Sequence, residues 1–155
     1  MANTYSQIYI QIVFAVEARQ CLIRPEHKEE LHKYITGIVT ERGQKLLAVH
    51  SMPDHTHLLA GLKPSMAVSD LARDLKNGSS NFVNRQGWMP GRFGWQEGFG
   101  AFSYGHSQIS VVIQYIRNQP QHHARRSFRD EYLRFLKRFE IQHEERFIFK
   151  DLDDE

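Results

Sequence analysis

Two histidines, His55 and His57, are the residues of this chain whose type and spacing most directly suggest chemistry. They follow a Pro-Asp turn and open an apolar run that continues through Leu58 and Leu59. In a β-strand, alternate side chains point to the same face, so the two imidazoles would project together from Cα atoms about 7 Å apart. Such a pair can hold one divalent metal ion, but it can equally be a pair of half-exposed histidines on an ordinary strand. The spacing alone does not decide between these interpretations.

A second pair of polar side chains lies further along the chain. Tyr115 and Gln119 are four residues apart in a segment with helical periodicity, so their side chains would lie on one side of the helix. They flank the apolar stripe of that helix and do not belong to it. Taken alone, Tyr115 would be a boundary aromatic residue with its hydroxyl in water, and Gln119 would be a surface amide near a helix end.

Hydrophobic periodicity predicts the elements that must position these residues. Alternation predicts strands at residues 5–16, 45–51, 55–62 and 99–104. Helical spacing predicts a helix at residues 25–43 and three more that begin near the N-cap residues Ser65, Ser107 and Ser127. The resulting order is β-α-β-β-α-β followed by two helices. This is the order of an α+β protein with a ferredoxin-like antiparallel sheet, helices on one face, and C-terminal helices that carry Tyr115.

The histidine pair is expected on the face of the sheet that the first two helices leave open. Thr56, Leu58 and Leu62 alternate with the histidines, so they would point into the helix-covered core. A bare apolar sheet face is costly in water, so another surface should dock there. Pro120 is expected to end or kink the helix of Tyr115, because proline lacks the backbone N–H that a helix interior needs.

The composition is that of an ordinary globular protein, and we expect one domain over residues 1–155 with an acidic tail at about 150–155. The chain has a mass of 18.2 kDa, 25% charged residues and a formal net charge of +2. So small a net charge confines any nucleic-acid-binding surface to local basic patches. A single cysteine, Cys21, excludes an internal disulfide and favours a reducing compartment, so we expect the cytoplasm. No apolar run of about 18 residues is present, so no membrane span is expected.

Three separated motifs together resemble the single-tyrosine HUH transposases of the insertion-sequence 200/605 type, which are related to the REP-associated tyrosine transposases. The motifs run from Met52 to Leu59, from Gly98 to Ser103 and from Tyr115 to Gln119. The resemblance covers nearly the whole chain, from the first strand to the fourth helix. Two positions depart from the family pattern. Thr56 stands where a bulky apolar residue is usual, and Pro120 stands where the helix more often continues.

The resemblance implies a metal-dependent DNA transposase and assigns roles residue by residue. His55, His57 and Gln119 would bind a divalent metal ion, Mg²⁺ or Mn²⁺, although such ligands also accept zinc. Tyr115 would attack a DNA phosphate and form a covalent 5′-phosphotyrosine, so that a strand is cut and later rejoined without ATP. The resemblance also implies a homodimer with composite active sites, in which the tyrosine helix of one subunit completes the histidine site of the other.

Single-stranded or hairpin DNA is the expected partner, with contacts on two basic surfaces. The polar side of the 65–85 helix and the basic run from residue 117 to residue 138 would neutralise phosphates. The candidate residues are Arg73, Lys76, Ser79, Ser80, Arg85, Arg117, Arg125 and Arg126. For any one residue of the basic run, an ordinary solvated helix face explains it equally well. His122 and His123 are adjacent and would face apart on a helix, so we expect surface or phosphate contacts there and no second metal site.

Aromatic residues near the Gly-rich segment 87–98 could stack on unpaired bases or pack in the core. They are Trp88, Phe93, Trp95, Phe99 and Phe102. Core packing is the better explanation for Phe99 and Phe102.

Two other functions fit part of the pattern. A domesticated relative would bind hairpin DNA without cutting it, and a small metal-dependent phosphodiesterase would use activated water in place of the tyrosine. The presence of His55, His57, Tyr115 and Gln119 in one chain favours the transposase over both. A covalent protein–DNA adduct would distinguish the transposase from either alternative.

Overall fold

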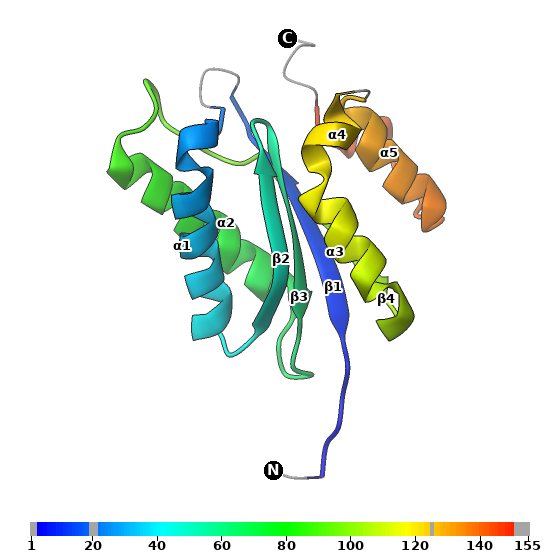
Figure 1. Cartoon of the computed structure of the whole chain (residues 1–155). Coiled ribbons are helices and arrows are strands. Elements are labelled where there is room, and N and C mark those ends of the chain that lie inside the picture. The colour runs from blue at the N-terminus through cyan, green and yellow to red at the C-terminus, as the bar shows by residue number, and fades with distance from the viewer. Residues whose placement is uncertain (1–2, 19–21, 125, 151–155) are drawn as a thin grey trace.

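A four-stranded antiparallel sheet with helices on both faces makes up the fold (Figure 1). Figure 1 shows a computed structural model of the chain, which describes residues 3–18, 22–124 and 126–150. The strands are β1 (Tyr9–Ala15), β2 (Lys45–Met52), β3 (His55–Gly61) and β4 (Gly100–Tyr104). Their order across the sheet is β2-β3-β1-β4, so the histidine strand β3 is internal. The predicted α+β class and the β-α-β-β-α-β order are confirmed.

The first two helices cover one face of the sheet. A short 3-10 turn, η2 (Pro25–His27), leads into α1 (Lys28–Glu41), and α2 (Val68–Gln86) follows β3. Leu31 of α1 and Leu75 of α2 are fully buried and belong to one core cluster with Leu58 of β3. This is the helix-covered core expected from the alternation along β3.

The opposite face is covered as well, so the expectation of an open sheet face is wrong. The segment from η3 (His106–Gln108) continues into α3 (Ile109–Arg117), α4 (Gln119–His123) and α5 (Phe128–Arg138). In Figure 1 these helices lie across the sheet from α1 and α2. Leu59 packs there against Val112 and Ile116 in a second core cluster. The chain's own C-terminal helices thus remove this apolar face from water, which periodicity within each helix does not reveal.

Of the three serines predicted to be N-caps, one caps its helix and two do not. Ser127 is the N-cap of α5 as predicted, and its hydroxyl accepts a hydrogen bond from the Asp130 N–H at 3.2 Å. Ser65 is not an N-cap, because α2 begins only at Val68, after Ala67. Ser107 lies inside η3, just ahead of α3.

Pro120 separates two helices, as predicted. α3 ends at Arg117, and α4 restarts with the proline in its first turn, where a missing N–H costs nothing. The last turn, η4 (Glu145–Phe147), precedes Ile148 and Phe149, which pack into the core. Among the described residues no helix is both long and apolar enough to cross a membrane.

Candidate functional site

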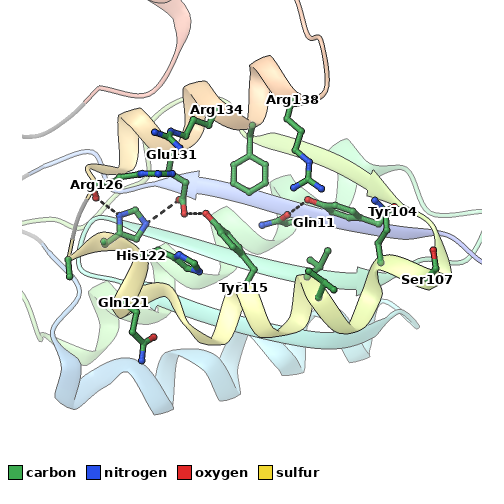
Figure 2. Close-up of a pocket in the computed structure, with 16 residues that line it drawn as sticks. Gln11, Tyr104, Ser107, Tyr115, Gln121, His122, Arg126, Glu131, Arg134 and Arg138 are labelled. Atoms are coloured by element: carbon green, nitrogen blue, oxygen red, sulfur yellow. Dashed lines mark hydrogen bonds and ion pairs between the residues drawn. The ribbon is translucent and has the colours of Figure 1, made fainter.

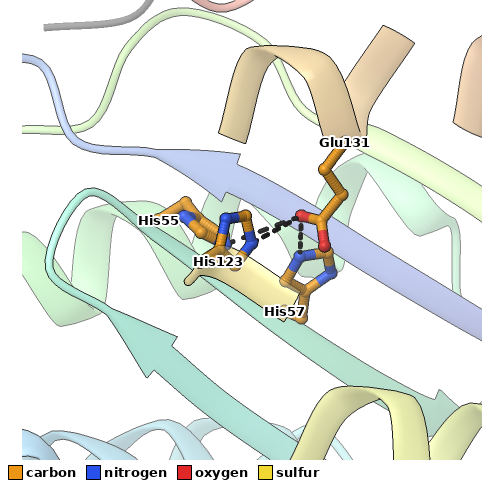
Figure 3. A group of neighbouring side chains, drawn as sticks. All are labelled: His55, His57, His123 and Glu131. Carbon is orange, nitrogen blue, oxygen red and sulfur yellow. Dashed lines mark hydrogen bonds and ion pairs between the residues drawn. The ribbon is translucent and has the colours of Figure 1, made fainter. Parts of the chain in front are cut away.

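Four side chains from three separate segments meet on the sheet face beneath α5 (Figure 3). His55 and His57 come from β3, His123 from the end of α4 and Glu131 from α5. One nitrogen or oxygen atom of each lies within 4.8 Å of the others. We call these residues the His–Glu cluster. The two strand histidines project from one face, as predicted, but they are fully buried and not half-exposed.

Glu131 is the hub of the cluster. Its Oε1 accepts a hydrogen bond from His57 Nε2 at 2.8 Å and lies 3.2 Å from His123 Nε2 and 3.7 Å from His55 Nε2. Its Oε2 accepts a hydrogen bond from the hydroxyl of Tyr115. Burial alone would raise the pKa of Glu131, but the neighbouring histidines outweigh it and hold that pKa well below its usual range. The group therefore stays a carboxylate inside the protein.

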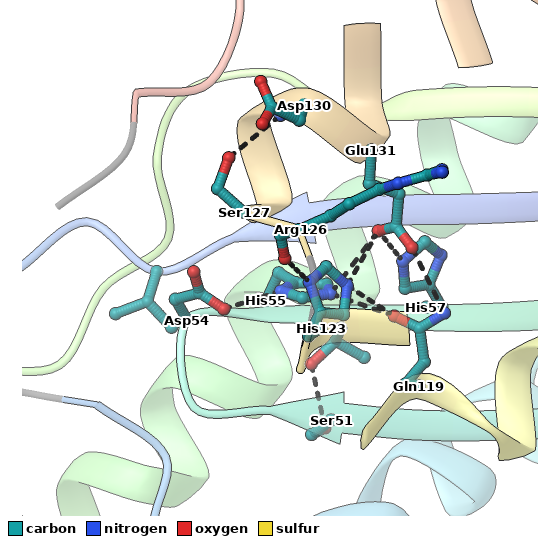
Figure 4. A network of polar contacts seen from close by, with 12 residues as sticks. Ser51, Asp54, His55, His57, Gln119, His123, Arg126, Ser127, Asp130 and Glu131 are labelled. Carbon is teal, nitrogen blue, oxygen red and sulfur yellow. Dashed lines mark hydrogen bonds and ion pairs between the residues drawn. The ribbon is translucent and has the colours of Figure 1, made fainter. Parts of the chain in front are cut away.

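Each histidine of the cluster is oriented by a hydrogen bond at its other ring nitrogen, and Figure 4 shows those of His55 and His123. His55 Nδ1 lies 2.6 Å from Asp54 Oδ1, and His123 Nδ1 lies 2.9 Å from the Arg126 carbonyl oxygen. His57 Nδ1 lies 2.8 Å from the side-chain amide of Gln11. All three Nε2 atoms consequently point at one another. Metal-binding histidines are held in this way, with one nitrogen anchored by the protein and the other directed at the ion.

Gln119 joins the cluster from the start of α4. The residue is fully buried, and its Oε1 lies 3.2 Å from His55 Nε2 and 3.0 Å from His123 Nε2. Its Nε2 donates to the Tyr115 carbonyl and to Glu131, both at 3.3 Å. The interpretation of Gln119 as a surface amide is therefore wrong.

Tyr115 lies at the edge of the cluster and is half-buried. Its ring centroid is 6.1 Å from that of His57 and 4.5 Å from that of His122, on which it stacks. Burial, together with the charge of Glu131, raises the pKa of the phenol above its usual value. The hydroxyl is thus a proton donor to Glu131 and keeps its proton until a base accepts it.

The donor set fits one divalent cation. It combines imidazole nitrogens with carboxylate and amide oxygens, which suit Mn²⁺ and zinc, and its oxygens also suit Mg²⁺. Ligand bonds to such ions are about 2.0–2.3 Å long, so opposite ligand atoms lie about 4–4.6 Å apart. The 4.8 Å spread of the His–Glu cluster would need only a small contraction.

Two members of the cluster were not predicted. His123 was expected on the surface, whereas its Nε2 faces His55 and Glu131, so that expectation is wrong. Glu131 was read only as an acid within a basic run. A signal for it exists, because Phe128, Glu131 and Phe135 share one helical face with apolar neighbours and all are buried. A carboxylate on the buried face of an amphipathic helix indicates a functional partner.

The α2 residues predicted to bind DNA lie on the sheet face opposite the cluster. Lys76 Nζ donates to the Gln96 and Gly98 carbonyls at 2.9 and 2.7 Å, and Arg73 pairs with Asp70. Ser79 is fully buried and its hydroxyl receives the Trp95 indole N–H at 3.0 Å, so it has no surface to offer DNA. Half-buried Ser80 donates to the Asn77 carbonyl, and Arg85 lies 3.4 Å from the Tyr34 hydroxyl.

The other basic residues predicted to bind DNA lie after β4, and the structure describes two of the three. Arg117 and Arg126 are exposed, on α3 and just before α5, and Arg125 lies outside the described residues.

Of the aromatic candidates, Phe93, Trp95 and Phe102 are core residues, which confirms the expectation for Phe102. Phe99 and Trp88 are partly buried and pack against the same core.

A cavity of about 960 Å³ opens beside Tyr115, between α3 and α5 (Figure 2). Basic residues line it from one end to the other, namely Arg126, Arg134 and Arg138. His123 and Glu131 of the His–Glu cluster also reach its wall. The tyrosine hydroxyl is therefore open to a ligand from one side and held by Glu131 on the other.

A family model for IS200-like transposases matches residues 4–119 of the chain. Among curated proteins, the ISDra2 transposase TnpA of Deinococcus radiodurans is 27% identical over 74 residues, which are 48% of this chain and 53% of that protein. The chain thus matches about half the length of this curated relative.

Two solved structures share the fold. The REP-associated tyrosine transposase bound to a REP hairpin has a TM-score of 0.60 at 16% identity, over 79% of this chain and 73% of that one. A crystal structure named as a transposase of Deinococcus radiodurans R1 has a TM-score of 0.58 at 23% identity, over 77% and 95%. At these identities the likeness concerns the fold alone.

Proposed function

This chain belongs to the family of IS200-like transposases, and we propose that it cuts and rejoins single-stranded DNA at hairpin-bearing ends through a covalent 5′-phosphotyrosine. One observation carries the proposal: the hydroxyl of Tyr115 and the inward nitrogens of His57 and His123 meet on the single carboxylate of Glu131. A nucleophile beside a cluster of metal-ligand type is an arrangement that suits phosphodiester cleavage through a covalent intermediate.

His55, His57 and Gln119 would hold the divalent ion, with His123 and Glu131 within reach of the same position. When bound, Mg²⁺ or Mn²⁺ would polarise the scissile phosphate and stabilise the negative charge of the transition state. The protein excludes water from the inner side of this site, because the cluster lies between the sheet and α5.

Tyr115 supplies the covalent step. Its oxygen attacks phosphorus while its proton passes to water in the adjacent cavity, and Glu131 orients the hydroxyl through their hydrogen bond. The bond from phosphorus to the 3′ oxygen breaks, and that oxygen takes a proton from water to leave a free 3′ hydroxyl. In the reverse step a 3′ hydroxyl attacks the phosphotyrosine and loses its proton to water, and the tyrosine oxygen regains a proton from water. The phosphodiester energy is conserved, so strands are exchanged without a nucleotide cofactor.

Hairpin DNA is the proposed partner. A relative of the same fold is described as bound to a REP hairpin, and this chain carries a basic cavity beside its tyrosine. A domesticated protein that binds such hairpins without cutting them remains the alternative, since binding does not need Tyr115.

The first prediction is a denaturation-resistant adduct between the protein and a hairpin oligonucleotide with single-stranded flanks, formed in Mn²⁺. Tyr115→Phe should remove the adduct entirely while the protein stays folded, because Glu131 keeps its contacts with His57 and Gln119. Removal of the ion with a chelator should do the same. Electrophoresis under denaturing conditions with a labelled oligonucleotide measures both.

The outcomes separate the three functions. Cleavage that persists in Tyr115→Phe without an adduct would identify a phosphodiesterase that uses water. Binding without cleavage in the wild-type protein would identify a hairpin-binding module.

A further inference from the structure

The cavity between α3 and α5 has the dimensions of an elongated binding groove. Its volume of about 960 Å³ lies near the upper end of the range for small-molecule sites, about 300–1,000 Å³. It extends from Arg126 at one end, past Tyr115, to Tyr104 and Arg138 at the other. This is more room than the single phosphate that Tyr115 attacks requires.

The groove is basic, and its cations are free to bind a ligand. Arg126, Arg134 and Arg138 line it and are exposed. Within the described part of the chain, none of the three guanidinium groups lies within ion-pairing distance of a carboxylate. The one acidic residue in the lining, Glu131, is engaged with the histidines and the tyrosine. An anion is therefore the ligand that the groove fits.

The spacing of the cations suits a chain of anions. Arg134 and Arg138 are one helical turn apart, about 6 Å along α5, and Arg126 precedes that helix at the end next to the His–Glu cluster. A single strand that followed these residues could place neighbouring phosphates on Arg134 and Arg138 and a more distant one on Arg126, and it would pass Tyr115 between them.

The opposite wall offers surfaces for bases. On α3, Val111 is 70% exposed although it is aliphatic, and it lines the groove together with Tyr104 and the exposed ring of His122. Aromatic and apolar surfaces within a basic groove are typical of sites for unpaired nucleic acid, because unstacked bases need a flat partner.

We propose that this α3–α5 groove holds the unpaired DNA strand next to the cleaved bond, with its phosphates on Arg126, Arg134 and Arg138 and its bases against Val111 and Tyr104. The proposal deepens the proposed function and rests on it for the identity of the polymer. Paired DNA is a poorer occupant, because the bases of a duplex face one another and would leave Val111 exposed. The α2 surface cannot share this strand, because it lies across the sheet from Tyr115.

The test measures binding apart from cleavage. In the Tyr115→Phe background, fluorescence anisotropy would compare a hairpin that has a single-stranded tail with the same hairpin cut flush. Arg134→Gln/Arg138→Gln removes two cations and keeps much of each side-chain stem. Lys137→Gln is the matched control, because it lies on the same helix, is exposed and does not line the groove.

The double variant should bind the tailed hairpin at least about 10-fold more weakly at low salt. The slope of log affinity against log salt should fall by about 1.4, at roughly 0.7 per lost single-strand phosphate contact. The flush hairpin and the Lys137→Gln control should be unaffected. Equal loss on both DNAs would assign the groove to the duplex, and an unchanged affinity for the tailed hairpin would exclude the groove; either result overturns the proposal.

Failure of the groove and failure of the proposed function can be told apart. A wild-type protein that forms the adduct, with variants that bind tailed DNA normally, overturns the groove alone. A tail-specific loss of binding supports the groove even if the wild-type protein forms no adduct, in which case only the proposed chemistry fails.

Discussion

Among the single residues of the site, Glu131 is the one that connects the proposed nucleophile, Tyr115, to the histidines proposed to bind the metal ion. One carboxylate oxygen faces the histidines and the other holds Tyr115. A buried carboxylate needs partners of this kind, because an unpaired charge is strongly destabilising in the interior. The same contacts that make Glu131 tolerable in the core therefore also fix the position of the tyrosine hydroxyl.

We expect Gln11 to decide which nitrogen of His57 carries the proton. Its amide lies 2.8 Å from His57 Nδ1, and it accepts a hydrogen bond from the Tyr104 hydroxyl at 2.7 Å. A metal ion at Nε2 requires the proton on Nδ1, and a 180° rotation of the Gln11 amide would present its oxygen to that proton. Its amino group would then donate to the Tyr104 oxygen, so both partners stay satisfied.

We therefore expect Gln11→Leu to bind Mn²⁺ about 10–100-fold more weakly than the wild-type protein. Gln11→Glu should bind it at least as tightly, because a carboxylate accepts the Nδ1 proton without any rotation. Calorimetric titration with Mn²⁺ measures both affinities. If the leucine and glutamate variants bind equally well, Gln11 does not set the tautomer of His57.

At the scale of elements, the sequence predicts each strand and helix well but not how the helices are distributed over the sheet. Alternation along β3 places His55 and His57 on one face, and a Ser127 N-cap starts α5. Neither pattern states which face of the sheet α5 covers, because an apolar stripe packs equally well against any apolar surface. His123 and Glu131 enter the site only through that packing, so local patterns could not identify them as ligands.

Gly100 is what allows α5 to approach the sheet. A Cβ added at this residue of β4 would lie 2.7 Å from Cε1 of Tyr132 on α5, too close for ordinary contact. Gly100→Ala should therefore displace α5, lower the free energy of unfolding by about 1–3 kcal/mol and weaken Mn²⁺ binding, because Glu131 moves with the helix.

Gly37→Ala on α1 is the matched control. Its Cβ would meet nothing within 4 Å, so it should stabilise the protein by about 0.5–1 kcal/mol through helix propensity and leave Mn²⁺ affinity unchanged. Denaturant unfolding and metal titration of both variants check this. Normal stability and affinity in Gly100→Ala would show that α5 is not positioned by this contact.

At the scale of the whole molecule, the site is complete within one chain. Tyr115 and all members of the His–Glu cluster come from the same polypeptide, and its own helices cover the face on which a second subunit was expected to dock. A homodimer stays a prediction, but the argument from a bare sheet face no longer supports it. We expect each chain to cut with its own tyrosine.

Mixing two inactive proteins tests this expectation. His55→Ala/His57→Ala combined with Tyr115→Phe should give no adduct, even when labelled subunits demonstrably exchange. Circular dichroism must first show that the histidine variant folds, because both histidines are buried. Recovery of the adduct would show that sites are shared between subunits.

The members of the His–Glu cluster are far apart along the chain, so they are synthesised at different times. His57 and Glu131 are separated by 74 residues, and His123 and Glu131 both follow the region that the family model matches, which ends at residue 119. A ribosome that has released residues 1–119 has made the strand histidines and the tyrosine, yet the helix that holds them together does not exist. The proposed capacity to cut DNA would therefore depend on residues made late in synthesis, and a product that ends before α5 should form no protein–DNA adduct.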